Sequence, residues 1–138
     1  ATAGAGVIAQ IEEGALRQHR PWPAGEGVGL GALSPETDAW PRVEIVTSHV
    51  NAGAGLVHAI VADGVQGIVV AGTGNGSIHH VLEAALRAAR DQGVAVLRSS
   101  RCLDGAVIDR ARDALPHAGA LTPVKARIEL LLQLMRGG

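Results

Sequence analysis

The sequence predicts an α/β fold: a small, parallel, Rossmann-like sheet flanked by helices and preceded by a β-hairpin and a linker. Three short apolar runs, VEIVTS (43–48), GIVVAG (67–72) and VAVLRS (94–99), recur every 24 to 27 residues. Their hydrophobicity is continuous rather than alternating, which is typical of strands covered on both faces of a parallel sheet. Helix-like segments lie between the runs, and this strand–helix–strand order favours right-handed crossovers.

Helices are expected beside these strands. Asn51 is a good N-cap for a first helix over 51–64, and apolar periodicity predicts a second over 77–91. Pro123 suits the first position of a final helix, and GAVIDRARDAL predicts a short one over 105–115. The expected buried side chains are Leu56, Val57 and Ile60 in the first helix, Ile78, Val81, Leu82, Ala85, Leu86 and Ala89 in the second, and Ile128, Leu131, Leu132 and Met135 in the last.

The first 42 residues have a different character. Residues 1–21 predict a β-hairpin that turns near Glu13-Gly14, whereas 22–42 are rich in Gly and Pro and predict a linker. An isolated hairpin is marginal in water, so its strands are expected to belong to a sheet in a missing N-terminal domain. The chain also begins ATAGAG, without Met, and is expected to be a piece of a longer protein.

Composition excludes several classes of function. With 138 residues, a net charge of −1 and scattered basic residues, the chain lacks the basic stripe of a nucleic-acid-binding protein. No apolar run approaches the roughly 20 residues that span a bilayer. His79 and Glu83 could share a helix face, but two ligands are too few for a zinc site, so no metal is expected.

The glycine turn in GIVVAGTGNGS (67–77) has two interpretations. A glycine turn between a strand and a helix is the place where a dinucleotide phosphate binds, but Ser77 replaces the third glycine and no acidic residue follows at the ribose position. The turn can instead present Asn75, flanked by Gly74 and Gly76, to a polar ligand at the carboxyl end of a strand. Asn is also a favoured turn residue, so a purely structural role stays open.

Nucleophile signals are weak. RSSRC (98–102) places Ser99, Ser100 and Cys102 beside Arg98 and Arg101, and these arginines could lower a thiol pKa. No nucleophile elbow or Ser/His/Asp order accompanies them.

The motifs VEIVTSHVNAG, GIVVAGTGNGS, VAVLRSSR and LTPVKARIELLLQL, in this order, resemble the C-terminal part of bacterial type II L-asparaginases (asparaginase–glutaminases). The resemblance covers roughly 43–135, and the hairpin looks like the one that closes the family's N-terminal domain. The implied organisation is therefore a hairpin (1–21), an interdomain linker (22–42) and the C-terminal α/β domain (43–138).

The resemblance implies hydrolysis of L-asparagine to L-aspartate and ammonia, by a threonine nucleophile and without cofactor or metal. The family motifs TGGTIA and TDT do not occur here, so no catalytic residue is expected in this chain and it is expected to be inactive alone. Its partners would be L-asparagine or L-aspartate and the N-terminal domains of its own and a neighbouring subunit, in a homo-oligomer that is a tetramer at full length.

The resemblance further implies that Asn75 reaches across the subunit boundary toward the substrate, with Gly74 and Gly76 beside it. The family also carries a Glu near the substrate amine, where this sequence has Arg110 to Arg112; Asp109 or Asp113 are the possible substitutes. An alternative is a ligand-binding or regulatory α/β module in which Asn75 and Arg98 contact a small anion or an amino acid. Localisation, in the bacterial periplasm or cytoplasm, stays open.

Overall fold

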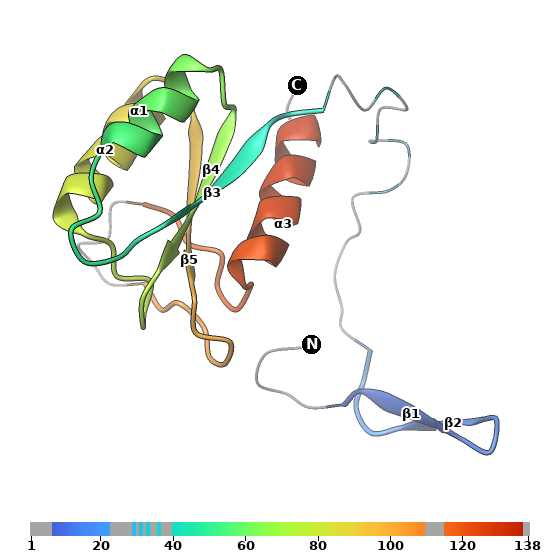
Figure 1. The fold of residues 1–138 in the computed structure, drawn as a ribbon. Helices are drawn as coiled ribbons and strands as arrows, with labels where there is room; N and C mark the ends of the chain where they lie inside the picture. Colours follow the sequence, from blue (N-terminus) through green and yellow to red (C-terminus); the bar gives the residue numbers. More distant parts are fainter. Residues whose placement is uncertain are drawn as a thin grey trace.

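The structure is a computed structural model that describes residues 7–22, 29, 31, 33, 36, 40–109 and 115–136. The elements in chain order are β1 (Ala9–Glu12), β2 (Ala15–Gln18), β3 (Val43–Thr47), α1 (Gly55–Ala62), β4 (Gly67–Gly72), α2 (His80–Asp91), β5 (Ala95–Ser100) and α3 (Pro123–Arg136) (Figure 1). β1 and β2 form an antiparallel hairpin, and the remaining elements form an α/β unit. The predicted fold class is confirmed.

The sheet of the α/β unit has three parallel strands in the order β3-β4-β5. Helices α1 and α2 lie against one face of this sheet and α3 lies against the other (Figure 1). All six residues of the central strand β4 are buried, because this strand is paired on both edges and covered on both faces. This arrangement explains why the strand is a continuous apolar run in the sequence.

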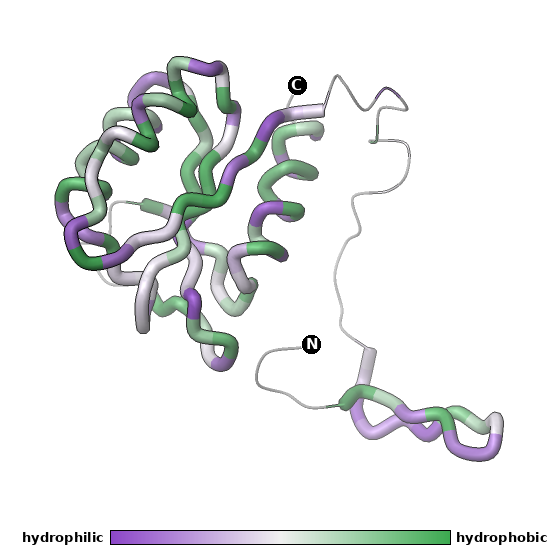
Figure 2. The backbone as a smooth tube through the Cα atoms, in the orientation of Figure 1, coloured by the Kyte–Doolittle hydropathy of each residue, from purple (hydrophilic) through white to green (hydrophobic). Residues whose placement is uncertain are grey.

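Each face of the sheet has its own hydrophobic core. Ile68 and Val70 on β4 point to the α1/α2 side and Val69 points to α3, as the alternation of side chains along a strand requires. The first core contains Val46, Ala52, Val57, Val65, Ile68, Val70, Leu82, Ala85, Leu86, Ala89, Val94, Val96 and Leu115; the second contains Val43, Val69, Ala126, Leu130 and Leu131. Figure 2 shows hydrophobic colouring along the strands and along the helices that cover them.

The first helix begins later than predicted. Asn51 is not its N-cap: it has φ +63 in a left-handed turn, and α1 begins at Gly55 after Ala54. Gly64, at φ +80, follows the helix end as predicted. The buried stripe is partly wrong, since Val57 is buried but Leu56 is exposed.

The second and last helices also differ from prediction in detail. α2 begins at His80 rather than near Ser77, which is used to close the preceding turn, and Val81 is exposed. α3 begins at Pro123 as predicted, but Ile128 is half exposed. Its buried residues are Ala126, Leu130 and Leu131, of which only Leu131 was predicted.

The short helix predicted over 105–115 is wrong where it can be assessed. Residues 105–109 form no helix, and 110–114 lie outside the described residues. Val107 is buried and its N–H donates to the carbonyl oxygen of Gly119 at 2.9 Å, so a tertiary contact holds this segment in an irregular conformation.

The hairpin turns at Glu13 (φ +49) and Gly14 (φ +80), where it was predicted to turn. Positive φ at both central residues is the geometry of a two-residue type I′ turn. Ile11 and Leu16 are directly opposed across the strands and both are largely exposed. The hairpin therefore has an exposed apolar face, and in Figure 2 hydrophobic and hydrophilic residues alternate along it. Within the described part of the chain, no helix has the length and hydrophobicity needed to cross a membrane.

The packing of helices on the sheet predicts unequal costs for the same substitution in two helices. Leu86→Ala should lower the free energy of unfolding by about 2–5 kcal/mol, because Leu86 is fully buried and the change leaves a cavity. Leu56→Ala in α1 is the matched control and should cost within about 0.5 kcal/mol, because Leu56 is exposed. Urea unfolding of both variants measures the difference, and equal losses would contradict the packing described above.

Candidate functional site

The glycine turn after β4 closes on itself. Thr73 and Ser77 exchange backbone hydrogen bonds, with N–H to oxygen distances of 3.1 and 2.8 Å. Gly72 lies so close to the returning chain that a Cβ there would be 2.6 Å from the carbonyl carbon of Gly76. Gly74 and Gly76 have φ of +50 and +75, a backbone region that glycine enters without strain. The turn therefore requires glycine for two separate reasons, close approach and positive φ.

This geometry does not suit a bound phosphate. A phosphate-binding loop directs free N–H groups at its ligand and runs directly into a helix N-terminus. Here the N–H groups of Thr73 and Ser77 bond within the turn, and α2 begins only at His80. The N–H of His79 in addition donates to the hydroxyl of Ser48 at 2.9 Å.

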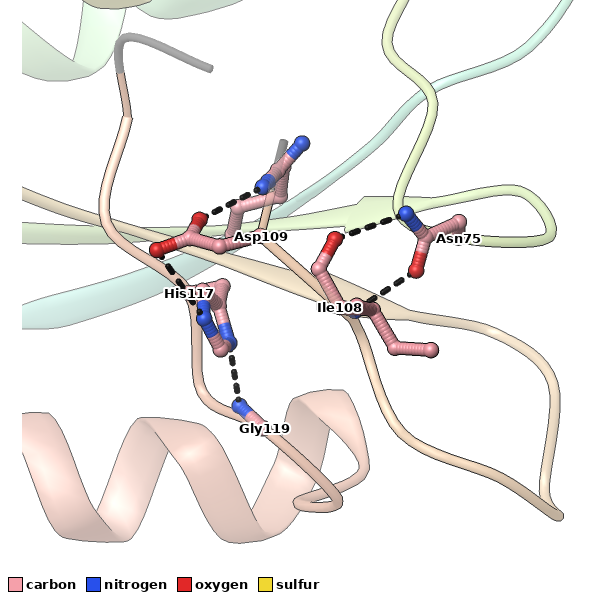
Figure 3. A network of polar contacts seen from close by, with 6 residues as sticks. Asn75, Ile108, Asp109, His117 and Gly119 are labelled. Atoms are coloured by element: carbon pink, nitrogen blue, oxygen red, sulfur yellow. Dashed lines mark hydrogen bonds and ion pairs between the residues drawn. The ribbon is translucent and has the colours of Figure 1, made fainter. Parts of the chain in front are cut away.

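Asn75 lies at the tip of this turn and is half-buried. Its side-chain Nδ2 donates to the carbonyl oxygen of Ile108 at 2.8 Å, and its Oδ1 accepts from the N–H of Ile108 at 2.7 Å (Figure 3). The amide thus pairs with both polar groups of one residue, 33 positions further along the chain. One N–H and one lone pair of the amide remain for another partner.

The chain that leaves β5 is bonded to the same turn at two more points. The Ser100 hydroxyl donates to the carbonyl oxygen of Gly74 at 2.6 Å. The N–H of Arg101 donates to the carbonyl oxygen of Gly72 at 2.9 Å. Gly76 contacts this region directly, since a Cβ there would be 3.1 Å from Cγ of Arg98 and 3.3 Å from a methyl of Val107. The turn and the segment after β5 consequently form one packed unit.

Asp109 is the acidic residue of this unit that lies beside basic side chains. Its carboxylate lies 3.6 Å from the Arg98 guanidinium and 3.5 Å from Nε2 of His117 (Figure 3). The Asp109 side chain is 70% exposed, whereas that of Arg98 is 9% exposed. The Arg98 side chain is therefore almost buried, with its guanidinium beside Asp109, and a ligand contact by Arg98 stays a prediction. Asp113, the other predicted acid, lies outside the described residues.

The hydroxyls of the RSSRC motif serve the fold. Ser99 is fully buried and donates to the carbonyl oxygen of Leu121 at 2.7 Å, and Ser100 donates to Gly74. Neither hydroxyl is bonded to a base that would activate it as a nucleophile. Cys102 is exposed and free.

The His79 and Glu83 side chains each have another neighbour. Glu83 pairs with Arg87, and the His79 ring lies 4.4 Å from that of His80 between centroids. Among the residues that the structure describes, no three His, Cys, Asp or Glu side chains are grouped to hold a metal ion.

An open hollow of about 600 Å³ lies beside the turn, at the carboxyl ends of the strands. It is lined by Ser48, His49, Val50, Thr73, Ser77, Ile78, His79 and Arg101. Hydroxyls, imidazoles and a guanidinium line it without a carboxylate, so its polar groups suit an anionic or neutral polar group better than a cation.

Fold and site together define a parallel α/β domain that carries a polar turn at the carboxyl end of its central strand. The family model that describes the "Glutaminase/Asparaginase C-terminal domain" matches residues 42–138. The chain is similar to L-asparaginase 2 of Bacillus subtilis, with 39% identity over 102 residues, which is 72% of this chain and 27% of that protein. It is similar to L-asparaginase 2 of Escherichia coli, with 39% identity over 99 residues, or 68% of this chain and 28% of that protein.

A third relative is the glutaminase-asparaginase of Acinetobacter glutaminasificans, 36% identical over 105 residues, which is 72% of this chain and 32% of that protein. The chain belongs to the glutaminase/asparaginase family of hydrolases and carries the family's C-terminal domain. It spans less than a third of the length of these relatives. The resemblance that the sequence motifs indicated is confirmed.

The structure brings Asn75, Gly74, Gly76 and Asp109 into one region, and their contact with a substrate stays a prediction. Two participants were not predicted. Ile108 contributes through its backbone, which no side-chain pattern reveals, and His117 shows no ligand spacing in the sequence.

The closed turn predicts a steric effect at Gly72. Gly72→Ala should destabilise the domain by about 3 kcal/mol, because the new methyl group meets backbone atoms that cannot move without opening the turn. Gly53→Ala is the control: a Cβ there meets nothing within 4 Å, and the residue does not have positive φ. Thermal or urea unfolding separates the two, and similar stability of both variants would show that the turn is not closed as described.

Proposed function

We propose that this chain acts as the C-terminal domain of an amidohydrolase that converts L-asparagine to L-aspartate and ammonia, and that it completes the active site of a neighbouring subunit. The observation that carries the proposal is the family match over residues 42–138 combined with Asn75 at the carboxyl end of β4. Ligands of open parallel sheets bind at this edge.

The division of labour follows from the chemistry. Hydrolysis of the side-chain amide breaks its C–N bond, adds water across it and releases ammonia. This reaction needs an activated nucleophile and groups that stabilise the oxyanion. Ser99 and Ser100 donate to backbone carbonyls instead, so we assign the nucleophile to the threonine motifs of the N-terminal domain. The 138 residues alone would then be inactive.

The role of this chain is substrate contact. After pairing with Ile108, the Asn75 amide has one N–H donor and one lone pair left for the substrate. Gly74 and Gly76 place no side chain beside it. The exposed carboxylate of Asp109 is our first candidate for the acid that meets the substrate amine, with Asp113 as the second.

The hairpin and linker fit the same assignment. We propose that residues 1–21 complete the sheet of the N-terminal domain, which would cover the exposed Ile11 and Leu16, and that 22–42 connect the two domains. The complete protein would be a homo-oligomer, a tetramer, in which each active site joins the N-terminal domain of one subunit to this domain of another.

Ammonia release from L-asparagine tests the assignment. The chain alone should show no turnover, and mixing it with an asparaginase N-terminal domain should produce turnover. Asn75→Ala should lower kcat/KM of the mixture by about 10- to 100-fold, because the change removes the hydrogen bonds that the Asn75 amide makes at the site. Gln133→Ala removes an exposed amide on α3 and should leave activity unchanged. Turnover by the chain alone, with contamination excluded, would overturn the assignment.

The exposed face of the hairpin predicts self-association of the isolated chain. Sedimentation velocity should show oligomers that weaken with Ile11→Thr, because this change removes apolar surface from the face shared with Leu16. Gln10→Thr changes the opposite face and should have no effect. A monomer at all concentrations, with residues 7–20 strongly protected from hydrogen exchange, would contradict this prediction.

A further inference from the structure

We propose that Asn75 is a positioning residue: its amide holds the segment Leu103–Asp109 against the glycine turn and thereby fixes the Asp109 carboxylate at the edge of the sheet. The inference rests on the proposed function in one respect, the use of Asp109 toward the substrate. The positioning itself depends only on contacts within this chain. In this role Asn75 acts on the substrate mainly through its neighbour Ile108, not through its own free N–H.

The segment Leu103–Asp109 has few attachments of its own. It is neither helix nor strand, and Val107 is its only buried residue. Leu103 and Ile108 expose most of their side chains. The N–H of Val107 donates to the carbonyl oxygen of Gly119. The next residue, Ile108, is hydrogen-bonded to the Asn75 amide through both its N–H and its carbonyl oxygen.

Distances indicate which contact dominates at Asp109. The two bonds between Asn75 and Ile108 are 2.7 and 2.8 Å long and connect well-matched donors and acceptors. The contacts of the Asp109 carboxylate with Arg98 and His117 are 3.6 and 3.5 Å long, and the Asp109 side chain is 70% exposed. Water and salt screen such exposed pairs strongly. The amide therefore fixes the backbone, and the ion pairs then orient the carboxylate.

Several contacts hold the turn in the conformation in which Asn75 bonds to Ile108. Gly76 allows Val107 and the stem of Arg98 to pack against the turn at 3.1 to 3.3 Å from where a Cβ would be. The Ser100 hydroxyl and the Arg101 N–H bond to the same turn. Asn75 is thus attached to a rigid base, so its amide is pre-oriented when it meets Ile108.

Hydrogen exchange in the 138-residue chain tests the positioning without any activity. In Asn75→Ala the Ile108 amide should exchange about tenfold faster, which is the expected effect of losing one hydrogen bond. Asn75→Asp keeps an acceptor for the Ile108 N–H and should restore part of the protection. The Ala118 amide, bonded to the Arg98 carbonyl on β5, is the internal reference and should be unchanged. An unchanged Ile108 rate in Asn75→Ala overturns the inference.

A double-mutant cycle on the activity of the mixed domains tests the functional part. Asn75→Ala and Asp109→Asn should each lower kcat/KM, and the double variant should lose no more than roughly threefold beyond Asp109→Asn alone, because both changes affect the same group. Losses that multiply would mean that Asn75 acts by direct contact, and would overturn the inference while leaving the proposed function intact. If no mixture of the domains hydrolyses L-asparagine, the proposed function fails. The hydrogen-exchange rate of the Ile108 amide then decides alone whether Asn75 holds the segment Leu103–Asp109.

Discussion

The close approach of the chain to itself between Gly72 and Ser77 is the constraint on which the functional edge depends. Only a residue without Cβ fits at Gly72, because the carbonyl carbon of Gly76 occupies that space. The closed turn places Asn75 at its tip and exposes the carbonyl oxygens that accept from Ser100 and Arg101. A polar side chain is oriented well only when its backbone is fixed. The hydrogen bonds of the site therefore depend on the close approach of Gly72 to Gly76, which closes the turn.

The turn is fixed because it is attached to the most deeply buried strand. β4 is paired with β3 and β5 and covered by helices on both faces, so its carboxyl end has little freedom. Segments of this kind open only with global unfolding, whereas loops with few buried contacts open locally. The segment after β5 has few buried contacts, and it gains order by bonding to the turn. The buried strand β4 thus restrains the turn, and the turn restrains Ile108 through the hydrogen bonds of Asn75.

The sequence predicted the parts of the fold that arise from local pattern. Continuous apolar runs identified the three parallel strands, and Glu13-Gly14 identified the hairpin turn. The pattern failed where tertiary contacts decide: Leu56 and Val81 fit a helical stripe but point away from the sheet, and Ser77 closes a turn instead of beginning a helix. The partner of Asn75 could not have been predicted, because it is the backbone of Ile108, and a backbone group has no signature in the sequence.

Asp109, the acid that we propose for the substrate amine, has a shorter side chain than the Glu that the family resemblance implies. The family resemblance implies a Glu near the substrate amine, and Asp is shorter by one carbon–carbon bond, about 1.5 Å. A shorter side chain can serve the same substrate only if its backbone lies closer to it. Side-chain flexibility cannot supply that displacement, whereas the conformation of the segment before Asp109 can. In our proposal Asp109 takes the place of this Glu, and the two hydrogen bonds between Asn75 and Ile108, one residue before the acid, set the backbone conformation that its carboxylate needs to reach the substrate.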